Sequence, residues 1–316
     1  MPMNPLFEFA SLGSGSSGNA TLVRAGRHLV LVDCGFGLKE TQHRLLRLGV
    51  SGAEITAILV THEHGDHIKG VGAFARKFNT PVYATPGTSH AQKLGRVPHL
   101  HLLEGFRALD LAVPGEAHPG SEKLSSSVAE VNSQLPGVLR IQPVAVPHDA
   151  REPAQFILQY QGLRLGILTD LGHISQHVQN AYAGCDALLL EANHCLDMLN
   201  FGDYPRQLKR RVAGQWGHLN NAQSAAFLKA LDTDRLKTLV LGHISRNNNS
   251  LERVKACFAK VLSSLPLATL RYACQDEGFN WLSVTGEHAG VDPASELLET
   301  PDTLESASNS RVNAVA

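Results

Sequence analysis

The chain has 316 residues, of which 43% are hydrophobic and 18% charged, and its formal net charge is −1. These values are typical of a globular protein with a sizeable core, in one large α/β domain or two small ones. A charge so near zero excludes a global field that steers the chain toward nucleic acid, so polyanion binding would need a local patch or bound metal. No apolar run is long enough to cross a bilayer, and residues 1–5 lack a signal-peptide pattern. We therefore expect a cytoplasmic protein with no membrane partner.

Five scattered cysteines without Cys-x-x-Cys spacing are expected to be reduced and mostly buried. The predicted elements begin with a hairpin, in which a Gly/Ser-rich turn over residues 13–19 joins strands at 7–12 and 21–24. Hydrophobic runs then predict buried strands at 29–32, 57–60, 144–146, 165–168, 187–190 and 238–241. Amphipathic periodicity predicts helices at 39–48, 68–78, 222–231 and 251–262.

The predicted organisation is one domain over residues 1–286. Residues 115–137 are rich in Ser, Pro, Gly and Glu and indicate a flexible surface insertion. Residues 287–316 hold few large apolar side chains and indicate a disordered tail. Neither segment is expected to carry the chemistry.

The predicted strands share one regularity, because each ends at a residue that can bind metal or carry a proton. These residues are Asp33, His62, His148, Asp170, Glu191 and His243. Ligand sites in open α/β architectures gather beyond the carboxyl ends of the strands. Six such coincidences are more than chance placement explains, so a single site at one edge of the fold is predicted.

The most specific signal is the segment His62-x-His64-x-Asp66-His67. Four candidate ligands within six residues suit a tight loop after a strand better than a continuous helical face. Gly65 allows the backbone to turn there so that ligands on both sides of it face inward. Asp66 and His67 are adjacent and can serve a second ion close to the first. The segment therefore predicts a two-metal site, against the alternative of a solvated polar loop.

This motif, together with the later strand-end residues in the same order, resembles the metallo-β-lactamase superfamily over about residues 7–284. The resemblance implies an α/β fold of the αββα sandwich type, with the site at one edge of two packed sheets. It assigns the first ion to His62, His64 and His148. It assigns the second ion to Asp66, His67 and His243. Asp170 would bridge the two ions, and Asp33 would orient the histidine loop from behind.

The expected cofactors are two divalent metal ions per chain. A ligand set of His and Asp without sulfur favours Zn²⁺ and also suits Mn²⁺ or Fe²⁺. Two ions about 3.5–4 Å apart can hold a bridging hydroxide and clamp both oxygens of an in-line displacement.

A second pair of residues concerns the substrate. Glu191, at a strand end, and His218, in a Gly-His loop, resemble a pair in the phosphodiesterase branch that includes ribonuclease Z. There the histidine protonates the leaving oxygen and the glutamate orients it. A sugar oxygen needs such an acid, whereas a thiolate does not, so the pair favours a phosphate ester over a thioester. The alternative is that both residues merely cap elements. Glu191, His218 and Asp66 are the predicted catalytic residues.

More narrowly, the chain resembles the compact bacterial YycJ-like group, which is regarded as comprising exonucleases. The matching stretches are residues 14–19, 191–194, 204–211, 217–221 and 242–248. Two departures are Cys195, where Asp is expected, and Asn220, where Ser is common. Neither is a proposed ligand, but both bear on substrate preference.

The predicted substrate contacts lie near these motifs in the sequence. At helical spacing, Arg206, Lys209 and Arg210 would share a face able to meet a phosphate backbone. An ordinary solvated helix face is about as good an interpretation. The remaining predicted contacts are Asn19, in the Gly/Ser turn, and Asn193 and His194, beside Glu191.

The function that these patterns indicate is that of a dinuclear phosphodiesterase acting on nucleic acid or a nucleotide-like ester. A metal-bridging hydroxide would attack phosphorus while His218 and Glu191 protonate the leaving oxygen. The alternative is a thioester or lactone hydrolase of the glyoxalase type. The expected partner is the phosphodiester substrate, and a homodimer is left open. The choice between RNA, DNA and cyclic nucleotide is not made by the sequence.

Overall fold

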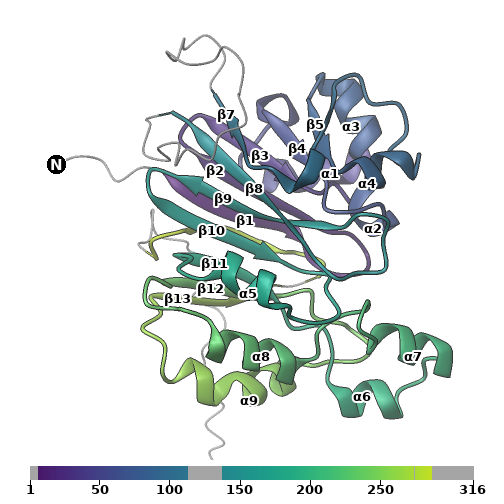
Figure 1. The fold of residues 1–316 in the computed structure, drawn as a ribbon. Helices are drawn as coiled ribbons and strands as arrows, with labels where there is room; N and C mark the ends of the chain where they lie inside the picture. The colour runs from purple at the N-terminus through teal and green to yellow at the C-terminus, as the bar shows by residue number, and fades with distance from the viewer. Residues whose placement is uncertain (1–5, 113–136, 274, 287–316) are drawn as a thin grey trace, which may run out of the picture.

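The computed structural model describes residues 6–112, 137–273 and 275–286. Two seven-stranded sheets pack face to face, and helices cover their outer faces (Figure 1). This arrangement confirms the predicted αββα sandwich. The predicted insertion at 115–137, apart from Gly137, and the predicted tail at 287–316 lie outside the described residues.

The first sheet has the strand order β14-β1-β2-β3-β4-β5-β6. Its strands are β1 (Phe7–Gly13), β2 (Ala20–Ala25), β3 (His28–Val32), β4 (Ala57–Leu59), β5 (Val82–Ala84), β6 (Leu100–Leu102) and β14 (Phe279–Ser283). Strands β3 to β6 run parallel, and the pairs that join β14, β1, β2 and β3 are antiparallel. The hairpin predicted at the N-terminus is the pair β1–β2.

The second sheet has the strand order β13-β12-β11-β10-β9-β8-β7. Its strands are β7 (Leu109–Leu111), β8 (Leu139–Ala145), β9 (Ala154–Tyr160), β10 (Leu163–Leu168), β11 (Ala187–Glu191), β12 (Thr238–Gly242) and β13 (Thr269–Tyr272). Strands β10 to β13 run parallel, whereas β7 to β10 pair antiparallel. Each sheet is therefore half parallel and half antiparallel, and the strands before most predicted site residues belong to the parallel halves.

The helices form the two outer layers. On the side of the first sheet lie α1 (Leu38–Arg47), α2 (Gly65–Ile68), α3 (Val71–Phe78) and α4 (Pro86–His90). Two short 3₁₀ turns are η1 (Gly52–Glu54) and η2 (Glu104–Phe106). On the side of the second lie α5 (Gln176–Tyr182), α6 (Leu196–Phe201), α7 (Arg206–Val212), α8 (Asn221–Ala230) and α9 (Leu251–Leu262). Among the described residues, no helix is both long and apolar enough to span a bilayer.

Three buried apolar clusters correspond to the three interfaces between layers. Phe9 and Phe156 belong to the cluster between the sheets. Phe74 of α3 packs under the first sheet, and Phe258 of α9 packs under the second. Because three packed interfaces hold the strands, the loops that leave the carboxyl ends of the parallel strands start from fixed positions.

Three residues that directly follow parallel strands adopt the left-handed backbone conformation. Asp33 after β3, Asp170 shortly after β10 and His243 after β12 have φ values of 62°, 52° and 54°. A side chain in this conformation costs about 1–2 kcal/mol relative to the right-handed region. The chain therefore turns sharply at the end of each strand, and it does so at residues that carry ionisable side chains.

One predicted helix is interrupted. The helix expected over residues 68–78 is divided into α2 and α3. The break lies at Gly70, whose N–H donates to the Cys34 carbonyl at 2.8 Å. A Cβ atom at Gly70 would lie 2.2 Å from the Phe36 carbonyl oxygen. Close packing against the loop after β3 overrides the amphipathic periodicity here.

The described cysteines are free thiols, as expected from their spacing. Cys34 and Cys185 are buried, Cys195 is intermediate and Cys257 is exposed. The expectation that most of them are buried therefore holds for two of these four.

Candidate metal centre

The His62–His67 segment begins in the loop after β4 and continues into a helix. His62 and His64 lie in the loop, whereas Asp66 and His67 belong to the one-turn helix α2. The predicted loop thus covers only the first half of the motif. Asn19 holds this turn from the facing β1–β2 loop, because its N–H donates to the Asp66 carbonyl at 2.8 Å.

Three imidazoles of the predicted first set converge. His64 Nδ1 lies 3.0 Å from His62 Nε2 and 3.3 Å from His148 Nε2. One ligand atom from each residue lies within 4.8 Å of the other two. The side chains of His62 and His148 are buried. Three nitrogens that point at one another suit a cation better than mutual hydrogen bonds, because imidazole is a common ligand of Zn²⁺ and related ions.

Contacts on the side away from the centre fix which nitrogen of His62, His67 and His148 faces the centre. His62 Nδ1 lies 2.9 Å from Thr61 Oγ1, which in turn donates to Asp33 Oδ2 at 2.8 Å. His67 Nδ1 lies 2.7 Å from the same Asp33 oxygen, and His148 Nδ1 lies 3.0 Å from the Gly217 carbonyl. In His62, His67 and His148, Nδ1 is engaged and Nε2 is left for the centre, whereas His64 faces the centre with Nδ1. Asp33 therefore makes the contacts that its predicted orienting role requires.

Asp170 lies between the two predicted ligand sets. Its Oδ2 lies 3.4 Å from His67 Nε2, and its Oδ1 lies 3.4 Å from His243 Nδ1. Oδ2 is buried and has no hydrogen-bond partner among the described residues. A buried carboxylate oxygen without a donor is costly unless a cation meets it. This orphaned oxygen, together with the surrounding imidazoles, fits a divalent ion.

The side chains of the predicted second set converge less than those of the first. Asp66 Oδ2 lies 3.7 Å from His67 Nε2, and these two residues face Asp170. The His67 and His243 rings are 6.3 Å apart between centroids. His243 instead joins a cluster with Asp170, Glu191 and His218. Asp170 thus links the two parts of the predicted second set.

The charges of the centre are strongly coupled. Burial lowers the pKa of His67, but the Asp170 and Asp33 carboxylates outweigh it and raise the pKa to about 10. Burial likewise lowers the pKa of His243, whereas Asp170 and Glu191 raise it to about 9. Burial raises the pKa of Asp170, and the surrounding histidines, His243 first, bring it well below its usual value. Without metal, protonated imidazoles supply the positive charge that this carboxylate needs.

Glu191 and His218 are in contact, as the sequence predicts. Glu191 Oε1 lies 2.9 Å from His218 Nδ1, and Oε2 accepts the Leu219 N–H at 3.0 Å. The Glu191 side chain is fully buried. Burial raises its pKa, but His218 and His243 outweigh this and lower the pKa to about 2. Glu191 is therefore an ionised, fixed carboxylate beneath the imidazole.

Glu191 has a further contact that the sequence did not indicate. Its Oε1 also lies 2.9 Å from His243 Nδ1. Strands β11 and β12 are neighbours, and Glu191 pairs in register with Gly242. This register places the next residue, His243, beside the carboxylate.

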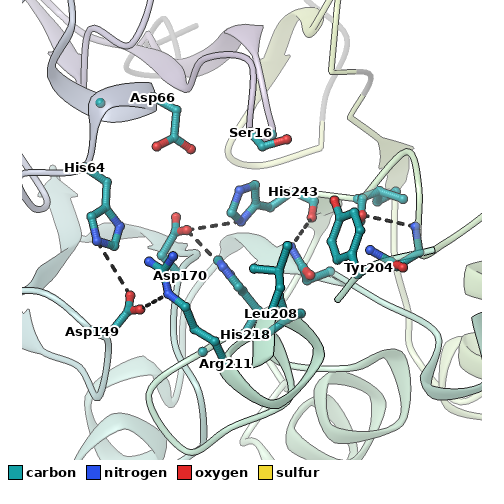
Figure 2. Close-up of a pocket in the computed structure, with 18 residues that line it drawn as sticks. Ser16, His64, Asp66, Asp149, Asp170, Tyr204, Leu208, Arg211, His218 and His243 are labelled. Carbon is teal, nitrogen blue, oxygen red and sulfur yellow. Dashed lines mark hydrogen bonds and ion pairs between the residues drawn. The ribbon is translucent and has the colours of Figure 1, made fainter. Parts of the chain in front are cut away.

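A pocket of about 360 Å³ opens over this centre (Figure 2). Figure 2 shows His64 and Asp149 on one side and Tyr204 on the other, with Asp170, His218 and His243 between them. The pocket lining is Gly15, Ser16, His64, Gly65, Asp66, Asp149, Asp170, Asn193, Tyr204, Leu208, Arg211, Val212, Gly217, His218, His243, Ile244, Ser245 and Asn248. A pocket of this size accommodates a small ligand or one unit of a polymer.

The residues predicted to contact substrate lie in different surroundings. Asn193 lines the pocket, and its Nδ2 donates to the His243 carbonyl at 3.2 Å. Asn19 is buried, and its Nδ2 lies 3.0 Å from His67 Nε2 and 3.4 Å from Asp66 Oδ2. It therefore borders the ligand residues and is absent from the pocket lining. His194 is also buried, and it lines a separate hollow between α8 and α9.

Helix α7 presents a different face to the pocket from the one predicted. Leu208, Arg211 and Val212 line the pocket, whereas Arg206, Lys209 and Arg210 are absent from its lining. Lys209 Nζ donates to the Asn200 carbonyl at 2.9 Å, away from the pocket. The signal for this orientation was the apolar pair Leu208 and Val212, which are half-buried and turn their side of the helix toward the pocket.

The sequence analysis also missed residues that complete the site. Asp149 follows His148 in the chain, and its Oδ1 lies 3.6 Å from His64 Nε2 and 3.5 Å from His148 Nε2. Ser14 Oγ accepts the His243 N–H at 2.9 Å. Adjacency to a predicted ligand was the one available signal for Asp149, and the Gly/Ser turn was the signal for Ser14.

Comparison with known proteins places this geometry in a family. The family described as "Beta-lactamase superfamily domain" matches residues 28–244. The chain is 33% identical over 254 residues to the protein named exodeoxyribonuclease YycJ of Bacillus anthracis, covering 80% of this chain and 88% of the relative. It is 30% identical over 246 residues to exodeoxyribonuclease WalJ of Streptococcus pneumoniae, covering 78% and 84%.

Among solved structures, the metallo-β-lactamase fold protein YhfI from Bacillus subtilis is similar with a TM-score of 0.59 at 15% identity. The match covers 87% of this chain and 99% of that one. The likeness concerns the fold, and the two sequence relatives cover most of both chains. The protein therefore belongs to the metallo-β-lactamase superfamily of hydrolases and, within it, to the YycJ-like group.

Proposed function

We propose that this protein is a metal-dependent phosphodiesterase that cleaves nucleic acid. The observation that carries the proposal is the contact of 2.9 Å between Glu191 and His218, at the wall of the pocket over Asp170. An acid oriented by a buried carboxylate is useful for a leaving alkoxide, which must gain a proton, and of little use for a thiolate.

The proposed metal ligands form two sets, and the donor atoms of the first set converge. His62, His64 and His148 would hold one divalent ion. Asp66, His67 and His243 would hold a second, with Asp170 between the two. Zn²⁺ is the first choice for this set, and Mn²⁺ is the second. When bound, such ions supply Lewis-acid stabilisation of phosphate oxygens and lower the pKa of water.

The chain's own residues supply the remaining steps. The Asp33 carboxylate, through Thr61 and His67, orients the imidazoles of the histidine loop. The buried Glu191 carboxylate accepts the Nδ1 proton of His218, which leaves Nε2 to carry the proton that goes to the leaving oxygen. Donation of this proton leaves His218 neutral, and solvent then restores the proton, because the His218 side chain is 22% exposed.

The relatives support the choice of substrate. YycJ and WalJ carry the name exodeoxyribonuclease, and the chain covers more than four fifths of each. We therefore propose DNA as the first substrate to test, cleaved from an end.

The test is a panel assay of the purified protein with Zn²⁺ or Mn²⁺ on three substrates: bis(p-nitrophenyl) phosphate, single-stranded DNA and a thioester. Hydrolysis of both phosphate esters and none of the thioester is the expected result. Cleavage of the thioester alone would overturn the proposal in favour of a glyoxalase-type hydrolase. A His62→Ala variant serves as the metal-site control, and it should lose all activity on the phosphate esters.

A further inference from the structure

Arg211 is held at the mouth of the pocket by one carboxylate. Its Nε donates to Asp149 Oδ2 at 2.5 Å, and both residues line the pocket. Among the described residues, Asp149 is the sole hydrogen-bond partner of the guanidinium. The terminal nitrogens of Arg211 are thus available to a ligand, and the planar group is already oriented.

Asp149 connects Arg211 to the metal centre. Figure 2 shows Asp149 between His64 and Arg211, with dashed contacts to each. Its other oxygen faces the Nε2 atoms of His64 and His148 at 3.6 and 3.5 Å. Asp149 therefore lies between Arg211 and the first ligand set, and Arg211 is a neighbour of the centre without being one of its predicted ligands.

Stability alone does not account for this ion pair. The Arg211 side chain is 59% exposed, and α7 has no buried residue. Exposed ion pairs contribute little to stability. Orienting a cation toward the pocket is a use that fits its place in the structure, because guanidinium groups bind phosphate oxygens through paired hydrogen bonds.

We propose that Arg211, aligned by Asp149, binds the phosphate next to the scissile one in a polynucleotide substrate. This inference rests on the proposed function. Bound ions would hold the scissile phosphate, and Arg211 lines the pocket with Asp149 between it and the first ligand set. Asp149 acts as a positioning residue, because it contacts the substrate only through Arg211. The site thereby distinguishes a nucleic-acid strand from a diester that carries a single phosphate.

The test compares Arg211→Ala with the wild type on an oligothymidylate and on bis(p-nitrophenyl) phosphate, which has no second phosphate. KM for the oligonucleotide should rise by about 10- to 100-fold, as for the loss of hydrogen bonds to a charged group. KM and kcat for the small diester should change far less, because it has no second phosphate for Arg211 to bind. The slope of log KM against log salt concentration for the oligonucleotide should fall by about 0.7, the value for one single-strand phosphate contact.

Arg210→Ala is the matched comparison, since it removes the same charge from the neighbouring position of the same helix. Arg210 is absent from the pocket lining. A local contact at Arg211 predicts a much larger rise in KM for Arg211→Ala than for Arg210→Ala. Equal effects of the two variants would overturn the inference, because they would reflect only the net charge of α7.

The role of Asp149 is tested with Asp149→Asn, alone and combined with Arg211→Ala. The single variant should raise KM for the oligonucleotide, and the double variant should add nothing to Arg211→Ala. Arg211→Lys should restore part of the affinity, because lysine keeps the charge and loses the planar fork. Metal content is measured in every variant, since Asp149 adjoins His64 and His148. An unchanged KM for the oligonucleotide in metal-replete Arg211→Ala would overturn the inference while hydrolysis of the small diester still upheld the proposed function.

Discussion

Oε1 of Glu191, the last residue of β11, lies 2.9 Å from Nδ1 of His218, which lines the pocket. The same oxygen lies 2.9 Å from Nδ1 of His243. One carboxylate oxygen thus orients both the proposed proton donor and a proposed metal ligand. Changes at His218 and at Glu191 should therefore have different consequences, although the two residues form one pair.

Replacing His218 tests the proton donor by itself. His218→Ala should slow cleavage of an alkyl phosphodiester by about 10²–10⁴-fold, the range for loss of a general acid. Hydrolysis of bis(p-nitrophenyl) phosphate should hardly change, because nitrophenolate leaves without a proton. Steady-state rates on the two substrates check this, with elemental analysis to show that the metal is retained. Uniform slowing of both substrates would assign His218 a positioning role.

Replacing Glu191 should weaken metal binding as well as proton donation. Glu191→Gln puts an amide where the carboxylate now accepts from His218, His243 and Leu219, so both imidazoles lose the nearer of their two carboxylate neighbours. Metal affinity should fall by about 10–100-fold, as for other residues that orient ligands. Both substrates should then be slowed at limiting metal. Chelator competition measures the affinity, and a wild-type affinity in Glu191→Gln would show that the contact with His243 is unimportant.

Asp66 should hold the second ion only. Its Oδ2 faces His67 and Asn19, whereas the first set of His62, His64 and His148 is complete without it. The wild type should bind two divalent ions per chain, and Asp66→Ala should bind one. Elemental analysis after dialysis provides the count, with Asp234→Ala as an exposed-carboxylate control. A single ion in the metal-replete wild type would contradict the dinuclear arrangement.

Metal binding should release protons and strengthen with pH. The pKa values of His67 and His243 are raised from 6.5 to about 10 and about 9 by the carboxylates that oppose the effect of burial. Both imidazoles are therefore protonated in the metal-free protein at neutral pH, and ions must displace about two protons. Calorimetry in buffers of different ionisation enthalpy counts them. No proton release at pH 7 would contradict these raised values.

The same shifts give the stability of the metal-free protein a definite pH dependence. The stability that the raised pKa values contribute is complete below 6.5 and is lost as pH rises through 9 and 10. Bound metal acts in the opposite sense, since it requires the neutral rings. The difference in Tm between metal-bound and metal-free protein should therefore widen from pH 6 to pH 9, as thermal unfolding can show.

The strand-end pattern predicted most of the centre because it is local. Each strand that leads to a predicted site residue was recognisable from its apolar run. Sheet geometry then brings the residues after neighbouring parallel strands together. Strands β5, β6, β7, β9, β13 and β14 were not predicted. Shortness explains β5 to β7, which have three residues each, but not β9, which has seven. The second contact of Glu191 was missed because it depends on the register between β11 and β12, which hydrophobic periodicity does not specify.

The face of α7 could not be predicted from its charges. Four cations in seven residues offer several faces, and packing of Leu208 and Val212 selects the one that includes Arg211. Likewise, Asp149 and Arg211 are separated by 62 residues, and only the folded chain brings them into contact. Residues that act through long-range ion pairs carry no local pattern.

Asp33, Asp170 and His243 hold ionisable side chains at φ values where glycine fits without strain. Glycine at any of them would relieve the backbone conformation and remove the ionisable side chain, so the backbone favours glycine where the site requires another residue. In a descendant released from selection for activity, the ionisable side chains would no longer be retained, and the backbone conformation would favour glycine or asparagine there. These three positions thus offer a way to tell working enzymes from decayed copies among genomic sequences of this family.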